Sequence, residues 1–183
     1  MLLEVPFMQD RLSAALPSDR TLLLASRRLE ATKLPRVEVT SPEFQNGSTL
    51  PTRATIDGDG TPPALHWGVL DPSPTSWVVI AEDPDAPGST PFVHWLVYAI
   101  PGATQLVAAN LNELRQGLND RGQIGYAPAA PPRGAGIHRY CFQLFALDTE
   151  LTLPEGRDLE RLLSAMQGHA IAWGELVGLY QRV

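Results

Sequence analysis

The sequence has little that could cross-link the chain or anchor it in a membrane. Its single cysteine, Cys141, excludes a disulfide within the chain, and its place in an apolar run predicts a buried thiol rather than a nucleophile. No apolar run approaches the ~18 residues that a membrane-spanning helix needs. Glu4 stands where a secretory signal would carry positive charge, so we expect a cytoplasmic protein without integral membrane association.

Positive charge is also scarce. Lys33 is the only lysine among 14 basic residues, and the formal net charge is -6. A nucleic-acid-binding protein needs a clustered positive field, so we expect no nucleic-acid partner. An anionic ligand would have to be held by local hydrogen-bond donors. With 183 residues, 44% of them hydrophobic and 19% charged, the chain can bury a core of its own.

The first 35 residues differ from the rest of the chain. Apolar residues with basic neighbours predict two short helices, over residues 11–16 and 21–29. We treat residues 1–35 as a helical N-terminal extension and residues 36–183 as the main domain. Leu22, Leu23, Leu24 and Leu29 are too apolar for a solvated arm, so we expect the extension to pack on the core or across a dimer interface.

From residue 37 onward the pattern predicts a mainly β fold. Apolar segments at 77–81, 93–100 and 140–147 resemble buried strands, and most of the 17 prolines and 15 glycines fall between such segments. Towards the C-terminus, helical spacing returns and predicts two helices. Their apolar faces would be formed by Leu159, Leu162, Leu163 and Met166, and by Trp173, Leu176, Val177 and Tyr180.

Polar residues gather where the predicted strands begin or end. A stiff loop at 83–87 (DPDAP) follows one strand, and His94 and His138 each open another. Strand alternation places His94 with Leu96 and Tyr98 on one face. The two histidines beside carboxylates predict a shared pocket at one end of a sheet.

Such a pocket could support three kinds of chemistry. Imidazole and tyrosine donors suit the oxygen atoms of a phosphate or carboxylate, and binding should strengthen in mildly acidic solution as an imidazole gains a proton. Two histidines with two aspartates could also hold a divalent metal, but their spacing matches no known site, so we expect none. Nucleophilic catalysis would need a serine or cysteine beside a histidine, and Cys141 faces away from His138 by alternation.

Taken together, the polar motifs resemble those of the phosphatidylethanolamine-binding protein family, in its bacterial Raf-kinase-inhibitor-like branch. The resemblance covers roughly residues 36–183. It is carried by 62–67 (PPALHW), 83–87 (DPDAP), 94–95 (HW), 131–140 (PPRGAGIHRY), 142–148 (FQLFALD), 168–170 (GHA) and 178–182 (GLYQR).

The resemblance implies a large central β-sheet, a second smaller sheet and C-terminal helices, with a small anion pocket at one end of the large sheet. It also implies the residues that bind the ligand. These are Asp83, Asp85, His94, Pro132, His138 and Tyr140, with Tyr180 on a bordering C-terminal helix. The loop 126–132 departs from the family pattern, because Pro128 and Ala130 stand where relatives usually have glycine.

The family resemblance favours a binding protein over an enzyme. Family members bind phosphate-like head groups and often modulate kinases or proteases, so we expect a small anionic ligand, no cofactor, and a kinase or protease as a candidate partner. A homodimer is considered as well. The alternative function is a hydrolase that uses the His and Asp cluster of the same pocket.

Overall fold

The structure is a computed structural model that describes residues 23–107 and 114–183. Helix α1 (Leu24–Arg28) opens this part, and helix α2 (Leu159–Met166) precedes the last strand. Two short 3-10 helices, η2 (Ala31–Lys33) and η3 (Thr52–Ala54), lie in the first third. The strands are β1 (Val39–Thr40), β2 (Ser48–Thr49), β3 (Leu65–Trp67), β4 (Ser76–Asp83), β5 (Phe92–Pro101), β6 (Leu106–Val107), β7 (Arg115–Gln116), β8 (His138–Leu147) and β9 (Ala170–Tyr180).

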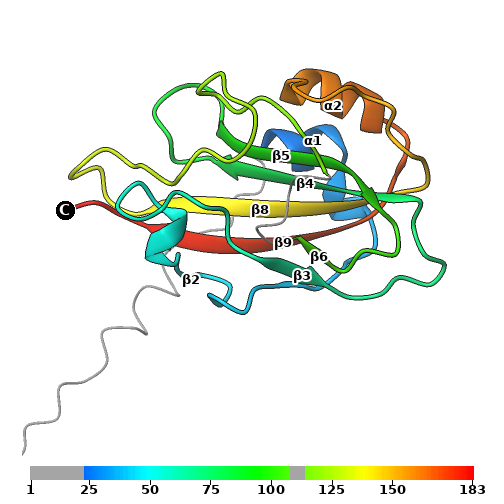
Figure 1. Cartoon of the computed structure of the whole chain (residues 1–183), viewed down its shortest axis with the longest axis horizontal. Helices are drawn as coiled ribbons and strands as arrows, with labels where there is room; N and C mark the ends of the chain where they lie inside the picture. The colour runs from blue at the N-terminus through cyan, green and yellow to red at the C-terminus, as the bar shows by residue number, and fades with distance from the viewer. Residues whose placement is uncertain (1–22, 108–113) are drawn as a thin grey trace, which may run out of the picture.

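A six-stranded sheet in the order β2-β9-β8-β4-β5-β7 forms the centre of the molecule (Figure 1). A three-stranded sheet, β1-β3-β6, lies against it. The predicted mainly β fold with one large and one smaller sheet is therefore confirmed. All eight residues of β4 are buried, as expected for a strand covered on both faces, and this explains its apolar run at residues 77–81.

Two apolar clusters cover the two faces of the large sheet. Strand alternation sends Trp77 and Val79 of β4 into the cluster shared with the small sheet, where Trp67 of β3 packs on Trp77. Val78 and Ile80 point into the opposite cluster, which the helices cover. Figure 1 shows α1 and α2 on one side of the large sheet and β3 and β6 on the other.

The helical predictions have mixed outcomes. Residues 159–166 form α2, and its four predicted core residues are buried. The second predicted C-terminal helix is wrong, because Trp173 to Tyr180 belong to β9, which pairs with β8 along its length. The N-terminal extension contributes α1 and η2, whose Ala25, Leu29 and Ala31 pack into the helix-side cluster. The predicted helix at 11–16 lies outside the described residues.

A helix was predicted where β9 lies because both faces of this strand are apolar. Trp173 belongs to the helix-side cluster and Leu176 to the cluster between the sheets, so no clean alternation is visible. Gly174 and Gly178 were the missed signal. A Cβ at Gly174 would lie 2.3 Å from the carbonyl oxygen of Val37, and one at Gly178 would lie 2.2 Å from Leu50. Glycine inside a strand commonly marks such close approach, whereas it is unfavourable within a helix.

A buried carboxylate fixes the start of α1. Glu82 of β4 has no exposed surface and accepts hydrogen bonds from the backbone N–H groups of Leu24 at 3.1 Å and Ala25 at 3.2 Å. Gln143 of β8 donates a third, at 2.6 Å, and in turn accepts one from Ser26. Unpaired helix N-terminal amides are costly when buried. Glu82 therefore serves as a cap supplied by the sheet, even though burial raises its pKa.

We predict that Glu82→Ala lowers the free energy of unfolding by about 2–4 kcal/mol, because three donors lose their acceptor and two of these hydrogen bonds are buried. Urea unfolding followed by circular dichroism measures this. The matched control is Glu160→Ala, which removes an exposed partner of Arg28 and should change stability by less than about 1 kcal/mol. Equal losses in the two variants would contradict a capping role for Glu82.

Candidate functional site

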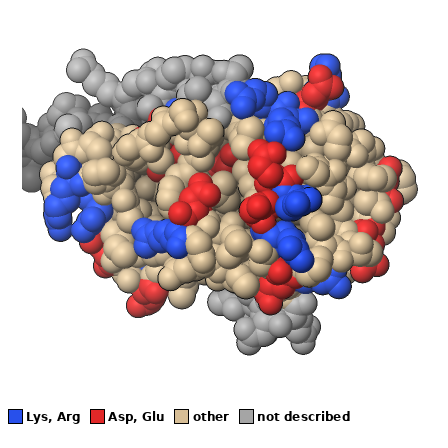
Figure 2. All heavy atoms as spheres, turned by 90° about the horizontal axis from the view of Figure 1, so that it is seen from above, with Lys and Arg blue, Asp and Glu red and all other residues tan. Residues whose placement is uncertain are grey.

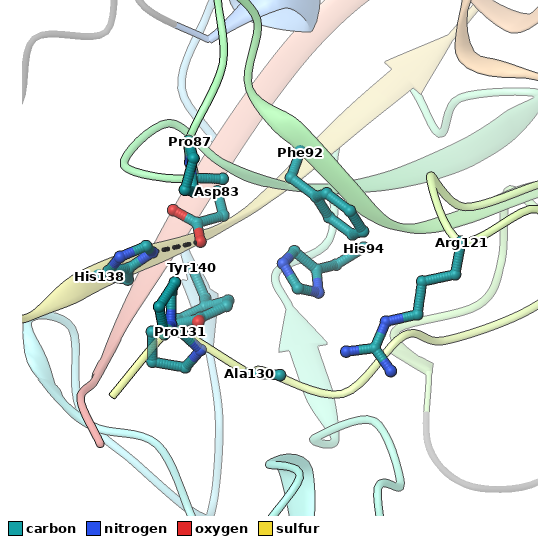
Figure 3. A pocket seen from close by; sticks show the side chains of 11 residues that line it. Asp83, Pro87, Phe92, His94, Arg121, Ala130, Pro131, His138 and Tyr140 are labelled. Carbon is teal, nitrogen blue, oxygen red and sulfur yellow. Dashed lines mark hydrogen bonds and ion pairs between the residues drawn. The ribbon is translucent and has the colours of Figure 1, made fainter. Parts of the chain in front are cut away.

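A cavity of about 190 Å³ opens at the end of the large sheet where β4 ends and β5 and β8 begin (Figure 3). Its walls come from these strand ends, from the loop after β4 and from the loop before β8. The lining residues are Asp83, Ala86, Pro87, Phe92, His94, Arg121, Ala130, Pro131, Pro132, His138 and Tyr140. Five of the seven predicted ligand-binding residues thus line one cavity.

A β-bulge aims His94 into this cavity. Ala81 of β4 pairs with Trp95 and the next residue, Glu82, pairs with Val93, so His94 is the extra residue of β5. Its ring packs edge-on against Tyr140, with ring centroids 5.0 Å apart. Leu96 and Tyr98 point into the helix-side cluster. The expectation that His94 shares their face is therefore wrong, because a bulge shifts the alternation by one residue.

The hydrogen bonding of His94 defines its tautomer. Its Nδ1 atom lies 2.7 Å from the carbonyl oxygen of Ala127, and a carbonyl can only accept, so Nδ1 carries the proton. Burial lowers the pKa of His94 to about 4, and the positive charge of Arg121 lowers it as well. The imidazole of the unliganded protein thus stays neutral in mildly acidic solution. A rise in anion binding there through His94 would therefore require that the bound anion itself raises the pKa of this imidazole.

His138 and Asp83 form a buried pair on the other side of the cavity. The Nδ1 atom of His138 lies 2.8 Å from an Asp83 carboxylate oxygen, and the side chains are only 5% and 4% exposed. The second carboxylate oxygen accepts the backbone N–H of Asp85 at 2.8 Å. Burial raises the pKa of Asp83, and the hydrogen bond from His138 opposes that rise. The pair orients the His138 ring so that its Nε2 atom is left for other partners.

Tyr140 carries a buried hydroxyl group without a partner. The residue is 2% exposed, and its Oη atom makes no hydrogen bond of ordinary geometry within the described part of the chain. The backbone N–H of Ala130 approaches the oxygen only weakly, so the hydroxyl proton has no acceptor. Burial and the negative charge of Asp83 raise the pKa of Tyr140, so it remains a donor at physiological pH.

Two predicted ligand-binding residues lie outside the cavity lining. Asp85 forms a two-pronged ion pair with Arg139, with contacts of 2.7 and 2.8 Å, and also accepts the Arg139 backbone N–H. This ion pair fastens the loop after β4 to the start of β8. Tyr180 is the last residue of β9 rather than part of a helix, and its hydroxyl is hydrogen-bonded to Asp57.

Arg121 is a cavity residue that the sequence analysis missed. Asp120 exchanges two hydrogen bonds with the backbone of Val93, at 2.7 and 3.0 Å, and so fixes the neighbouring Arg121 beside β5. The Arg121 side chain is exposed and extends along the cavity rim (Figure 3). The sequence of the turn at residues 119–122 (NDRG) gave no reason to single out the arginine.

The two residues of the loop 126–132 that depart from the family pattern lie in different places. Ala130 lines the cavity, whereas Pro128 packs near Gly60.

The described residues around the cavity were also compared with the requirements of metal binding and nucleophilic catalysis. Within residues 23–107 and 114–183, no three His, Cys, Asp or Glu side chains are arranged to hold a metal ion. The cavity lining contains no serine, threonine or cysteine, and Cys141 is buried with a raised pKa. No helix in the described part is long and apolar enough to cross a bilayer. On the face shown in Figure 2, acidic and basic side chains are interspersed.

A strand-end pocket of this kind, on a two-sheet β fold, defines a class of small ligand-binding domain. The family model described as phosphatidylethanolamine-binding protein matches residues 40–181. The chain belongs to the phosphatidylethanolamine-binding protein family. A UPF0098 protein of Aquifex aeolicus is 39% identical over 153 residues, which cover 80% of this chain and 89% of that relative.

Solved structures show the same fold. The chain is similar to a structure described as a putative phosphatidylethanolamine-binding protein homologue from Chlamydia trachomatis, with a TM-score of 0.75 and 37% identity, covering 81% of this chain and 99% of that one. It is also similar to YbcL of Escherichia coli, with a TM-score of 0.72 and 28% identity over the same shares. Carboxypeptidase Y inhibitor, at 14% identity and a TM-score of 0.53, shares the fold alone.

We predict that the imidazole of His94 titrates far below the ordinary 6.5, near the value of about 4 that burial imposes. Since the unfolded chain takes up this proton first, the fold should lose stability as pH falls from 6.5 towards about 4. A two-dimensional NMR titration of the imidazole signals measures the pKa, and His94→Gln identifies the resonance by its loss. A midpoint near 6.5 would show that the ring is solvated.

Proposed function

We propose that the cavity binds a small anion, a phosphate or a phospholipid-head-group-like group, and that this binding is the primary function of the protein. The observation that carries the proposal is the hydroxyl of Tyr140, a buried donor without an acceptor that belongs to the wall of the cavity. A buried donor left unpaired costs about 1–3 kcal/mol, which an oxygen atom of a bound anion would relieve. The predicted ligand-binding residues supported by this geometry are Asp83, His94, Pro132, His138 and Tyr140.

The charges around the cavity support an anion held by few contacts. Arg121 at the rim supplies a full positive charge, and its guanidinium is exposed and donates one long hydrogen bond, at 3.5 Å, to the carbonyl oxygen of Pro128. Asp83 is negative when ionised, but both of its oxygen atoms already accept hydrogen bonds, from His138 and from the backbone of Asp85. The carboxylate is thus directed at its protein partners, and the donors are left for the ligand.

The alternative function, a hydrolase, has only the His138–Asp83 pair in its support. A histidine oriented by a carboxylate could activate water, but the cavity wall carries no covalent nucleophile. Modulation of a kinase or protease partner belongs to the proposal as a consequence of the family resemblance. The homodimer and the cytoplasmic location belong to it as expectations from the N-terminal sequence.

We predict that Tyr140→Phe weakens phosphate binding about tenfold, the effect of one lost hydrogen bond, without lowering stability. The matched control is Tyr98→Phe, because the Tyr98 hydroxyl donates to the carbonyl oxygen of Pro154 at 2.6 Å, away from the cavity. Tyr98→Phe should lower the free energy of unfolding by about 1 kcal/mol and leave phosphate affinity unchanged. Isothermal titration calorimetry and urea unfolding measure the two quantities, and unchanged phosphate affinity in Tyr140→Phe would rule out the proposed role of its hydroxyl.

We predict that Arg121→Gln weakens phosphate binding severalfold at low ionic strength, and that the difference shrinks in about 0.5 M salt, which screens an exposed charge. Arg161→Gln, on the exposed side of α2, removes the same charge away from the cavity and serves as control. The same calorimetric titration at two salt concentrations measures both variants. A loss of affinity that is equal in the two variants would assign the effect to net charge rather than to Arg121.

A further inference from the structure

The cavity contains a hydrogen-bond acceptor as well as donors. The Nδ1–H group of His94 is committed to the carbonyl of Ala127, so only Nε2 is left for a ligand, and it has no hydrogen-bond partner within the described ranges. In a neutral imidazole with the proton on Nδ1, Nε2 is a lone pair. The ring is held in place by Phe92 and Tyr140, with centroid distances of 4.7 and 5.0 Å.

The surroundings of His94 maintain this neutral form. The positive charge of Arg121 disfavours a further positive charge on the ring, and a proton on His138 would act in the same direction. The other titratable groups at the cavity are Asp83, whose oxygen atoms are occupied, and Tyr140, which keeps its proton. An anion in this cavity therefore meets a donor at Tyr140, a cation at Arg121 and a lone pair at His94.

A lone pair discriminates between anions of similar shape. An anionic oxygen without a proton is repelled by Nε2, whereas an acidic O–H group donates to it. We propose that the pocket selects an anion with its own acidic O–H group, namely inorganic phosphate or a singly protonated phosphomonoester, over sulfate and over a phosphodiester. This inference rests on the proposed function and narrows its ligand class, because a phospholipid phosphodiester has no such O–H group.

Calorimetric titration of the wild-type protein tests the selection directly. At about pH 8, hydrogen phosphate and sulfate are both tetrahedral dianions, and they differ mainly by one O–H group. We expect phosphate to bind about tenfold or more tightly than sulfate, and more tightly than dimethyl phosphate, which represents the phosphodiester. Equal affinities for phosphate and sulfate, or tighter binding of dimethyl phosphate, overturn the selection while leaving an anion site in place. Failure of all three anions to bind overturns the proposed function itself.

A pair of variants locates the selection at His94. In His94→Gln the side-chain amide can turn its NH₂ group towards the ligand, so the ratio of phosphate to sulfate affinity should fall towards one. His169→Gln is the matched control, because His169 pairs with Asp148 at 2.8 Å, is 47% exposed and does not line the cavity. An unchanged ratio in folded His94→Gln overturns the assignment to His94. Should circular dichroism show that variant unfolded, the wild-type comparison of the three anions decides alone.

Discussion

The burial of the large sheet on both faces is the constraint on which the rest of the molecule depends. One face packs against the small sheet and the other against α1 and α2, so neither face can hold a solvated polar group at low cost. Polar residues are therefore tolerated mainly at strand ends, where loops can satisfy them. The cavity lies at such an end. Its aspartate, histidines and tyrosine occupy the last residue of β4 and the first residues of β5 and β8.

The loops at this end are fastened by hydrogen bonds as well as by apolar packing of Tyr126 and Ala129. Asp85 ties the loop after β4 to Arg139, and Asp120 ties the loop before β8 to Val93. Ala127 and His94 exchange two hydrogen bonds, at 2.7 and 2.8 Å, across the same gap. These contacts explain how residues distant in sequence share one small cavity. They also explain why Asp85, which the resemblance implies as a ligand-binding residue, lies outside the cavity lining and in contact with Arg139.

Local sequence patterns predicted much of the fold and part of the site. The strands β4, β5 and β8 were visible as apolar runs, and α2 as a helical repeat with all four core residues correct. Strand β9 could not be predicted in this way. Its two glycines are needed because Val37 and Leu50 approach the strand closely, and these neighbours are known only from the structure. The same holds for the bulge at His94 and for Arg121, which depend on register and on tertiary contacts. Periodicity within one segment cannot contain that information.

The hydrogen bonds between α1 and the sheet have a consequence for how the chain can be divided. The family model begins at residue 40, and Glu82 and Gln143 lie well inside the matched region. Their hydrogen-bond partners Leu24, Ala25 and Ser26 lie before it. The region that the family model matches is therefore smaller than the unit that satisfies its own buried polar groups. A fragment that begins at residue 40 would leave the buried side chains of Glu82 and Gln143 without their partners in α1. Moving the cavity into another protein would therefore require moving α1 with it.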